Sequence, residues 1–263
     1  MPRPHALGLI LAAVAAVLAG PARAQLSFSL SADTDYRVRG VSLSDGKPDL
    51  ALSVNYDHDS GAYGGASLLA DEGLNGDPRA LGGLVYAGLS RRFTDGLAWD
   101  VGGELAQLSD QVDLRLPVPA STGYQPGDAD LAEPRWRTQT AYYRPRYAEV
   151  YAGLISDLGS ARLYYSPDYL NEHIGAAYLD LNTSVRPAPR WRLFAHAGAL
   201  TPVSGSAQFG YRRERYDLRL GSALEFQGYE LRLAWSLERP DSAYPLGTPQ
   251  KSNVFIFGAS YFF

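Results

Sequence analysis

The stretch Leu26 to Ser44 limits the possible folds more than any other feature of the chain, because as far as Arg39 it alternates one by one between apolar and polar side chains. One parity begins with Leu26, Phe28 and Leu30, and the other runs through serines to aspartates and arginines. Because successive side chains of a β-strand point to opposite faces, the alternation predicts a strand. An extended segment over 26–38 would reach roughly 40 Å. That length is unusual for a soluble strand and typical of a membrane β-barrel.

The N-terminal residues have the features of a secretory signal peptide. Arg3 precedes an apolar run over 6–20, and Pro21-Ala22-Arg23-Ala24 has the small-x-small pattern of a cleavage site ending at Ala24. We therefore expect residues 1–24 to be removed and residues 25–263 to form the folded domain. The chain contains no cysteine, which excludes disulfides and zinc–thiolate sites.

Twelve alternating segments, separated by clusters of Gly, Pro, Asp and Asn, are predicted as strands. They cover residues 26–38, 50–58, 62–70, 81–93, 97–108, 146–156, 160–166, 174–185, 190–200, 215–226, 229–238 and 252–263, and the prolines after residue 24 all lie outside them. Long and short connections alternate without exception. This sorting is expected when one rim of an up-and-down barrel carries extracellular loops and the other carries periplasmic turns.

No apolar run after residue 24 is long enough for a membrane-spanning helix, so a membrane protein of this sequence could only be a closed β-barrel. The formal net charge of −4 makes nucleic-acid binding a poor match. We expect an all-β, transmembrane, antiparallel up-and-down β-barrel of about 12 strands. It would lie in the Gram-negative outer membrane, against lipid and lipopolysaccharide. The oligomeric state is left open.

Aromatic residues gather beside the predicted short turns, as in the girdle of a membrane barrel: Tyr56, Tyr63, Phe93, Trp99, Trp191, Phe226, Tyr229, Tyr261 and Phe263. The last strand closes with Tyr261-Phe262-Phe263 and resembles the signal by which bacterial outer-membrane proteins are recognised for insertion. Tyr261 and Phe263 are therefore expected to contact the barrel-assembly machinery.

The longest connection, 109–145, is expected to be extracellular. It either folds into the mouth of the barrel or extends the neighbouring strands above the membrane, because Val112, Leu114 and Leu116 continue the alternation. Loops of this length are usually functional or disordered. Within it, Asp128, Asp130 and Glu133 could hold a divalent ion, although a solvated loop is the commoner outcome.

Two stretches resemble the TorF-type porin family of proteobacterial outer-membrane proteins. The first is Tyr36-Arg37-Val38-Arg39-Gly40-Val41-Ser42, followed by Pro48. The second is Tyr147-Ala148-Glu149-Val150-Tyr151-Ala152-Gly153, followed by Tyr164-Tyr165-Ser166-Pro167-Asp168-Tyr169. The resemblance implies an outer-membrane barrel with a presumed pore. It assigns no catalytic residue and no solute.

Charged side chains at inward parity are the candidate pore-lining residues: Asp33, Asp35, Arg37, Arg39, Asp100, Glu104, Glu149, Arg162, Asp180, Arg192, Asp217, Arg219, Glu225, Glu230 and Arg232. Lumen charges set selectivity in pores. Alternatively, opposite charges neutralise one another in a partly filled barrel, and the sequence leaves both interpretations open. Because both signs are present, neither cation nor anion selectivity is predicted.

No catalytic, metal or cofactor site is expected. Asp57-His58-Asp59 straddles a tight turn, so its side chains should diverge, and His196 has no placed serine and acid partner. The predicted function is a channel for passive diffusion of small hydrophilic solutes or ions. The alternatives are an outer-membrane barrel enzyme acting on lipid and a closed structural or adhesive barrel. The enzyme would need a serine and a histidine at matching height facing lipid.

Overall fold

The computed structural model describes residues 25–72, 76–117, 136–171, 173–205, 214–239 and 251–263. The predicted signal peptide lies outside them, and so do Asp128, Asp130 and Glu133 of the long connection. Among the described residues, no helix has both the length and the apolar character needed to cross a membrane.

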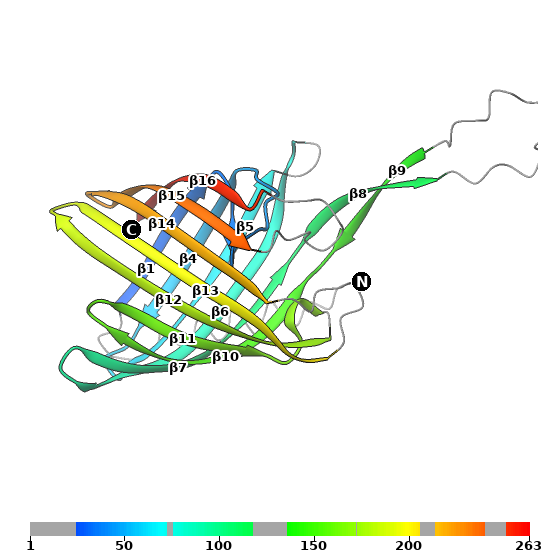
Figure 1. The fold of residues 1–263 in the computed structure, drawn as a ribbon. Helices are drawn as coiled ribbons and strands as arrows, with labels where there is room; N and C mark the ends of the chain where they lie inside the picture. The colour runs from blue at the N-terminus through cyan, green and yellow to red at the C-terminus, as the bar shows by residue number, and fades with distance from the viewer. Residues whose placement is uncertain (1–24, 73–75, 118–135, 172, 206–213, 240–250) are drawn as a thin grey trace, which may run out of the picture.

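Twelve strands of the described chain close into one antiparallel ring, as the sequence predicts (Figure 1). Around the ring they follow the order β1, β16, β15, β14, β13, β12, β11, β10, β7, β6, β5, β4 and back to β1. Their bounds are β1 (Gln25–Asp33), β4 (Asp49–Asp57), β5 (Ala62–Glu72), β6 (Pro78–Thr94), β7 (Leu97–Leu108), β10 (Arg146–Ser156), β11 (Gly159–Ser166), β12 (Ile174–Ala188), β13 (Trp191–Gly205), β14 (Arg215–Phe226), β15 (Tyr229–Arg239) and β16 (Asn253–Phe262).

The first and last strands complete the ring. β1 pairs with β16 from Ser29↔Phe262 to Asp33↔Gly258. Beyond that register, the backbone N–H groups of Phe28 and Phe263 each donate to the other residue's carbonyl, at 3.1 and 3.0 Å. Their rings stack with centroids 5.7 Å apart. The C-terminal residue therefore helps to close the barrel.

Alternation along the strands separates an apolar exterior from a polar interior. On β7, Leu105 and Val101 are 58% and 42% exposed, whereas Asp100, directly before Val101 and at the opposite parity, is fully buried. The same contrast holds on β15, where Leu231 is exposed and Glu230 is buried. Tyr63 departs from the predicted girdle. Its hydroxyl donates to Asp100 at 2.5 Å inside the barrel.

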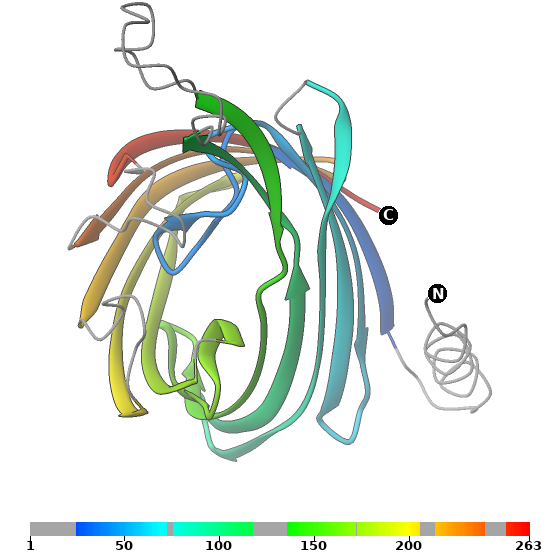
Figure 2. The ribbon, with the colours of Figure 1, turned by 90° about the vertical axis from the view of Figure 1, so that its right-hand side faces the viewer.

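The first predicted strand, 26–38, is wrong at its C-terminal end, because β1 stops at Asp33. The chain then leaves the wall and forms a small hairpin of β2 (Arg37–Val38) and β3 (Val41–Ser42). Figure 2 shows this connection curving into the ring. Tyr36 and Val38, which the alternation placed on the outer face, pack instead against an apolar cluster that includes Leu69 and Leu81.

The longest connection takes the opposite course. β8 (Asp110–Pro117) pairs with β9 (Trp136–Tyr143) in a separate two-stranded sheet, which extends away from the ring (Figure 1). Of the two arrangements predicted for this connection, the structure has the strand extension. Several ring strands are also longer than predicted. Pro187 of β12 and Pro202 of β13 fall within them, close to two register shifts of this strand pair.

Candidate functional site

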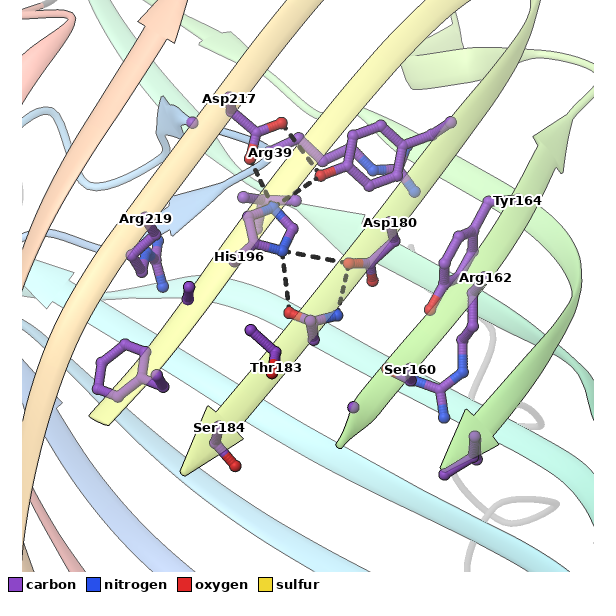
Figure 3. A pocket seen from close by; sticks show the side chains of 18 of the residues that line it. Arg39, Ser160, Arg162, Tyr164, Asp180, Thr183, Ser184, His196, Asp217 and Arg219 are labelled. Carbon is purple, nitrogen blue, oxygen red and sulfur yellow. Dashed lines mark hydrogen bonds and ion pairs between the residues drawn. The ribbon is translucent and has the colours of Figure 1, made fainter. Parts of the chain in front are cut away.

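The interior of the ring contains a cavity of about 670 Å³. Its lining runs from Ser156 and Ser160, beside the short turn between β10 and β11, to Arg39 at the tip of the first hairpin. Figure 3 shows charged and hydroxyl side chains of the wall pointing into this space. A smaller cavity of about 170 Å³ lies between the hairpin and β14 to β16, and Arg219 lines both. The lumen is therefore partly filled and polar.

Ion pairs connect many of the inward-pointing side chains. Asp100 accepts hydrogen bonds from Arg162 Nε at 2.6 Å and from the Tyr63 hydroxyl. Because a buried carboxylate needs partners to offset its lost hydration, this pairing explains how Asp100 is tolerated inside. The other inward pairs are Arg79–Asp71, Arg192–Glu225, Arg192–Glu230, Arg215–Glu238, Arg232–Asp33 and Arg232–Glu230. These pairs show opposite lumen charges in contact, which is one of the two interpretations that the sequence leaves open.

His196 on β13 lies at the centre of a second network (Figure 3). Its Nε2 is 2.7 Å from Asp217 Oδ1, and its Nδ1 is 3.1 Å from Asp180 Oδ1. The Tyr178 hydroxyl donates to Asp217 at 3.0 Å. Carboxylates, a phenol and an amide surround the imidazole. These contacts connect side chains of β12, β13 and β14 on the wall of the cavity.

The first hairpin turns at Arg39 and Gly40. Both have positive φ, 52° and 81°, as in the type I′ turns that connect two-residue hairpins. Glycine adopts this conformation freely, whereas a residue such as arginine does so at a cost. A Cβ on Gly40 would lie only 2.9 Å from the Cβ atoms of Asp217 and Glu238. The turn is therefore pressed against β14 and β15.

A polar lock holds the hairpin closed. Asp35 accepts hydrogen bonds from Arg37 Nε at 2.6 Å and from the Ser42 hydroxyl at 2.5 Å. The other guanidinium nitrogens of Arg37 donate to the carbonyls of Gly40 and Lys251, each at 2.7 Å. Since Lys251 lies two residues before β16, Arg37 connects the hairpin to the start of the strand that pairs with β1.

Apolar contacts anchor the base of the hairpin. Val41 and Leu43 are 4% and 7% exposed and pack with Leu69, Leu81 and Leu108 of β5, β6 and β7. Burial raises the pKa of the neighbouring Tyr36 phenol to about 12, so this side chain is neutral throughout the physiological range. The hairpin thus contacts strands on opposite sides of the barrel.

Arg39 crosses the lumen and enters an aromatic cage. Its guanidinium carbon lies 4.3 Å from the ring centroid of Tyr178, and 5.2, 5.5 and 5.9 Å from those of Tyr169, Tyr164 and Tyr147. Two of its nitrogens donate to the two carboxylate oxygens of Glu149. We call the side chains of Tyr147, Glu149, Tyr164, Tyr169 and Tyr178 the Arg39 cage. The two stretches that carry the family resemblance therefore contact one another here.

The fifteen charged residues singled out from the sequence occupy three places. Around the large cavity lie Arg37, Arg39, Glu104, Arg162, Asp180, Arg192, Asp217 and Arg219. Around the small cavity lie Asp33, Asp35 and Arg232, together with Arg37 and Arg219. Asp100, Glu149, Glu225 and Glu230 line neither cavity and accept hydrogen bonds from arginines. Asp35, Arg37 and Arg39 are on the inserted hairpin rather than on the wall, because β1 ends before them.

Sequence reasoning missed the tyrosines of the Arg39 cage. For Tyr147 the sequence does give a signal, since this residue has the same inward parity as Glu149. Nothing local, however, indicates that four rings from β10, β11, β12 and the 3-10 turn η2 (Tyr169–Asn171) surround one cation. The Arg39-Gly40 pair between two valines was a usable turn signal. Within the described part of the chain, no group of three or more His, Asp or Glu side chains is arranged to hold a metal ion.

Comparison with known proteins gives a partial family match and a fold match. Residues 18–106 match a family model described as a bacterial protein of unknown function (Gcw_chp). No curated protein matches the chain. The NanC porin, solved in a rhombohedral crystal form, is similar with a TM-score of 0.53 and 8% identity, over 90% of this chain and 99% of that one. The KdgM porin gives a TM-score of 0.48 at 7% identity, over 89% and 98%. The NanC likeness shows that the chain has the fold of an outer-membrane β-barrel.

Proposed function

We propose that this protein is a porin-like channel of the outer membrane, through which small hydrophilic solutes or ions diffuse passively. The observation that carries the proposal is the polar cavity of about 670 Å³ inside a closed ring whose exterior is apolar. An apolar exterior suits lipid, and a charged lumen suits water and solutes. The fifteen inward charges remain our candidates for the residues that a permeating solute meets.

The first hairpin would restrict this channel. It lies between the large cavity and the rim where β1 ends and β4 begins, and it contacts the wall through Arg37, Arg39 and Val41. We expect a low conductance in the conformation described, because a solute must pass beside the hairpin or displace it. Arg219 donates to the carbonyl of Arg37 at 3.3 Å and borders both cavities, which places it beside any path between them.

The remaining expectations extend this proposal. Export by the signal peptide 1–24, contact of the exterior with lipid and lipopolysaccharide, and recognition of Tyr261 and Phe263 by the barrel-assembly machinery all fit a channel of the outer membrane. The resemblance to TorF-type porins agrees with the same interpretation. The exposed ring of Tyr261, stacked with Phe263 at 5.5 Å between centroids, supports an interfacial position for the C-terminus.

Planar-bilayer recording of the refolded protein tests the proposal. In one variant, residues 34–48 are replaced by a short Asn-Gly turn, which can join β1 to β4 because Asp33 already pairs with Asp49. We expect small unitary currents from the native chain and severalfold larger ones from the variant. If the variant folds to the heat-modifiable form and both proteins are nonconducting, the channel proposal fails.

That negative outcome would favour the closed structural barrel, for which the inserted hairpin is the specific supporting observation. A lipid-acting enzyme has less support among the described residues. His196 faces the lumen, and the Nδ1 of His58 is 2.8 Å from Ser60 Oγ within an exposed turn. Neither arrangement combines a nucleophile, a base and an acid on the lipid-facing side.

A further inference from the structure

The Arg39 cage is built by the barrel wall and not by the hairpin that fills it. Tyr147 and Glu149 lie on β10, Tyr164 on β11 and Tyr178 on β12, while Tyr169 follows β11 in η2. The rings also contact one another. The Tyr147–Tyr169 and Tyr164–Tyr178 centroid distances are 6.1 and 6.3 Å. Since strands of a closed barrel fix four of the five cage residues, all but Tyr169, the cage should largely keep its shape when Arg39 leaves.

The chemistry of the cage is specific for a planar cation. Four aromatic rings attract positive charge through their faces. The two oxygens of Glu149 accept two parallel N–H groups of one guanidinium, a geometry that an ammonium cannot reproduce. An emptied cage would therefore bind guanidinium better than ammonium.

A second acidic side chain, Glu104, lies beside the cage. Glu104 on β7 is directly opposite Glu149 on β10, and both point inward. Like charges opposite one another destabilise a strand pair unless a cation compensates them. Arg39 is the cation that bonds Glu149, so its withdrawal would leave Glu149 without this partner beside a second acidic side chain.

A solute can approach the cage from the lumen. Arg39, Glu104, Tyr147, Tyr164 and Tyr178 all border the large cavity, so the occupied cage forms part of the cavity wall. In the described structure the side chain of Arg39 is 8% exposed. A cation in the cavity would thus meet the cage at the point where the hairpin tip enters it.

We infer that the Arg39 cage is a recognition site for solutes carrying a guanidinium group, and that Arg39 is an internal ligand which such a solute displaces, releasing the hairpin from the lumen. This deepens the proposed channel function by naming a solute class. Binding to the cage does not depend on conduction, so the two proposals can fail separately.

Calorimetric titration with methylguanidinium chloride tests the site. The refolded Arg39→Ala variant should bind the probe saturably in the millimolar range, and the native chain should bind at least about tenfold more weakly because Arg39 competes. The matched control is Arg39→Ala/Glu149→Gln, which keeps the rings and removes the carboxylate. We expect it to lose about tenfold or more in affinity. Methylammonium should bind Arg39→Ala more weakly than methylguanidinium.

The recognition site is refuted if the native chain, Arg39→Ala and Arg39→Ala/Glu149→Gln bind methylguanidinium with equal affinity. It is also refuted if Arg39→Ala binds methylguanidinium and methylammonium equally well. Heat-modifiable electrophoretic mobility verifies that each variant is folded. Retained ion conduction in the absence of binding would leave the channel intact and the recognition site refuted. Conversely, expected binding by Arg39→Ala, with neither the native chain nor the 34–48 replacement conducting, would refute the channel alone.

The displacement step has its own readout. The chain has no cysteine, so Val41→Cys introduces a single thiol at a position that is 4% exposed and of similar size. We expect maleimide to label this thiol slowly in sodium chloride. When methylguanidinium chloride replaces sodium chloride at the same ionic strength, the labelling rate should rise severalfold. Methylammonium chloride is the control for cation size. A labelling rate that does not respond to saturating methylguanidinium would refute displacement of the hairpin.

Discussion

At the scale of single residues, Gly40 has both a special backbone conformation and a special place in the packing. Its φ of 81° falls in the left-handed region, and β14 and β15 leave no room for a Cβ. Gly46, in the same connection, also has a positive φ of 71° but has no atom within 4 Å of a Cβ position. An alanine at Gly46 would therefore introduce backbone strain alone, whereas an alanine at Gly40 would introduce the same strain and a steric clash.

We predict that Gly40→Ala destabilises the inserted hairpin by about 1–3 kcal/mol from strain, with the clash added. In a Val41→Cys background, maleimide labelling should be faster by about tenfold or more, because the labelling rate follows the population of the released state. Gly46→Ala should raise the rate less. Equal rates for the two variants would show that contact with Asp217 and Glu238 does not hold the hairpin.

Asp100 shows how much a fully buried charge depends on its partner. We predict that Asp100→Asn lowers the free energy of unfolding by about 3–5 kcal/mol, because it leaves the Arg162 guanidinium without its carboxylate. Urea titration in lipid vesicles, followed by tryptophan fluorescence, measures the change. Arg186→Ala is the comparison, since the Arg186 side chain is 60% exposed in its pair with Glu225. It should cost no more than about 1 kcal/mol, and a similar loss in both variants would contradict the argument.

At the scale of elements, two connections of the same barrel behave in opposite ways. The first folds inward, because its valines, its leucine and its arginines find buried partners on several strands. The longest continues as β8 and β9, paired from Asp110↔Tyr143 to Pro117↔Trp136. β7 and β10 pair directly below it, from Gln107↔Arg146 onward, so the ring does not need this hairpin.

We accordingly predict that removing residues 113–140, and joining Val112 to Ala141 by an Asn-Gly turn, leaves the unfolding free energy within about 0.5 kcal/mol. Unitary conductance should stay at the native value, because the hairpin extends away from the ring (Figure 1). The replacement of 34–48 is the matched variant in which conductance should rise. A changed current after the 113–140 deletion would indicate that this connection covers the mouth.

At the scale of the whole molecule, stability depends on a ring that is apolar outside and polar inside. Val101 lies midway along β7 on the outer face, and Leu158 lies in the short turn between β10 and β11. Their side chains are 42% and 75% exposed, so exposure alone would make Leu158 the more accessible position. The cost of introducing a charge follows depth in the membrane instead, because a charge is costly only in the hydrocarbon region. Arginine should therefore be tolerated less well at Val101 than at Leu158.

Val101→Arg should therefore cost about 2–4 kcal/mol of unfolding free energy in vesicles, and Leu158→Arg about 0–1 kcal/mol. Urea-induced unfolding from lipid vesicles is the measurement. The same two substitutions compared in detergent micelles, which adapt to the protein surface, should differ less. Equal losses in vesicles would place the membrane elsewhere on the barrel.

The fold was largely accessible from the sequence because it depends on short-range periodicity. Alternation such as Leu231 and Leu233 against Glu230 and Arg232 states which face of a strand meets lipid, and the alternation of long and short connections states the direction of each strand. These local signals predict the twelve strands, their antiparallel neighbours and the inward position of the charges. The pairing of the first strand with the last also follows, because an up-and-down ring must join them, whereas the register that brings Phe28 beside Phe263 comes from the structure.

The interior was decided by the tertiary structure. The alternation from Tyr36 to Val38 fits a strand as well as a hairpin, and only the surrounding wall chooses between them. Arg39 bonds Glu149 across a sequence separation of 110 residues, and the rings around it come from three strands and a turn. A periodic pattern fixes the face of each side chain but not which distant side chain it meets across a closed ring. That choice depends on curvature, register and the volume left inside the barrel, which exist only once all twelve strands have paired.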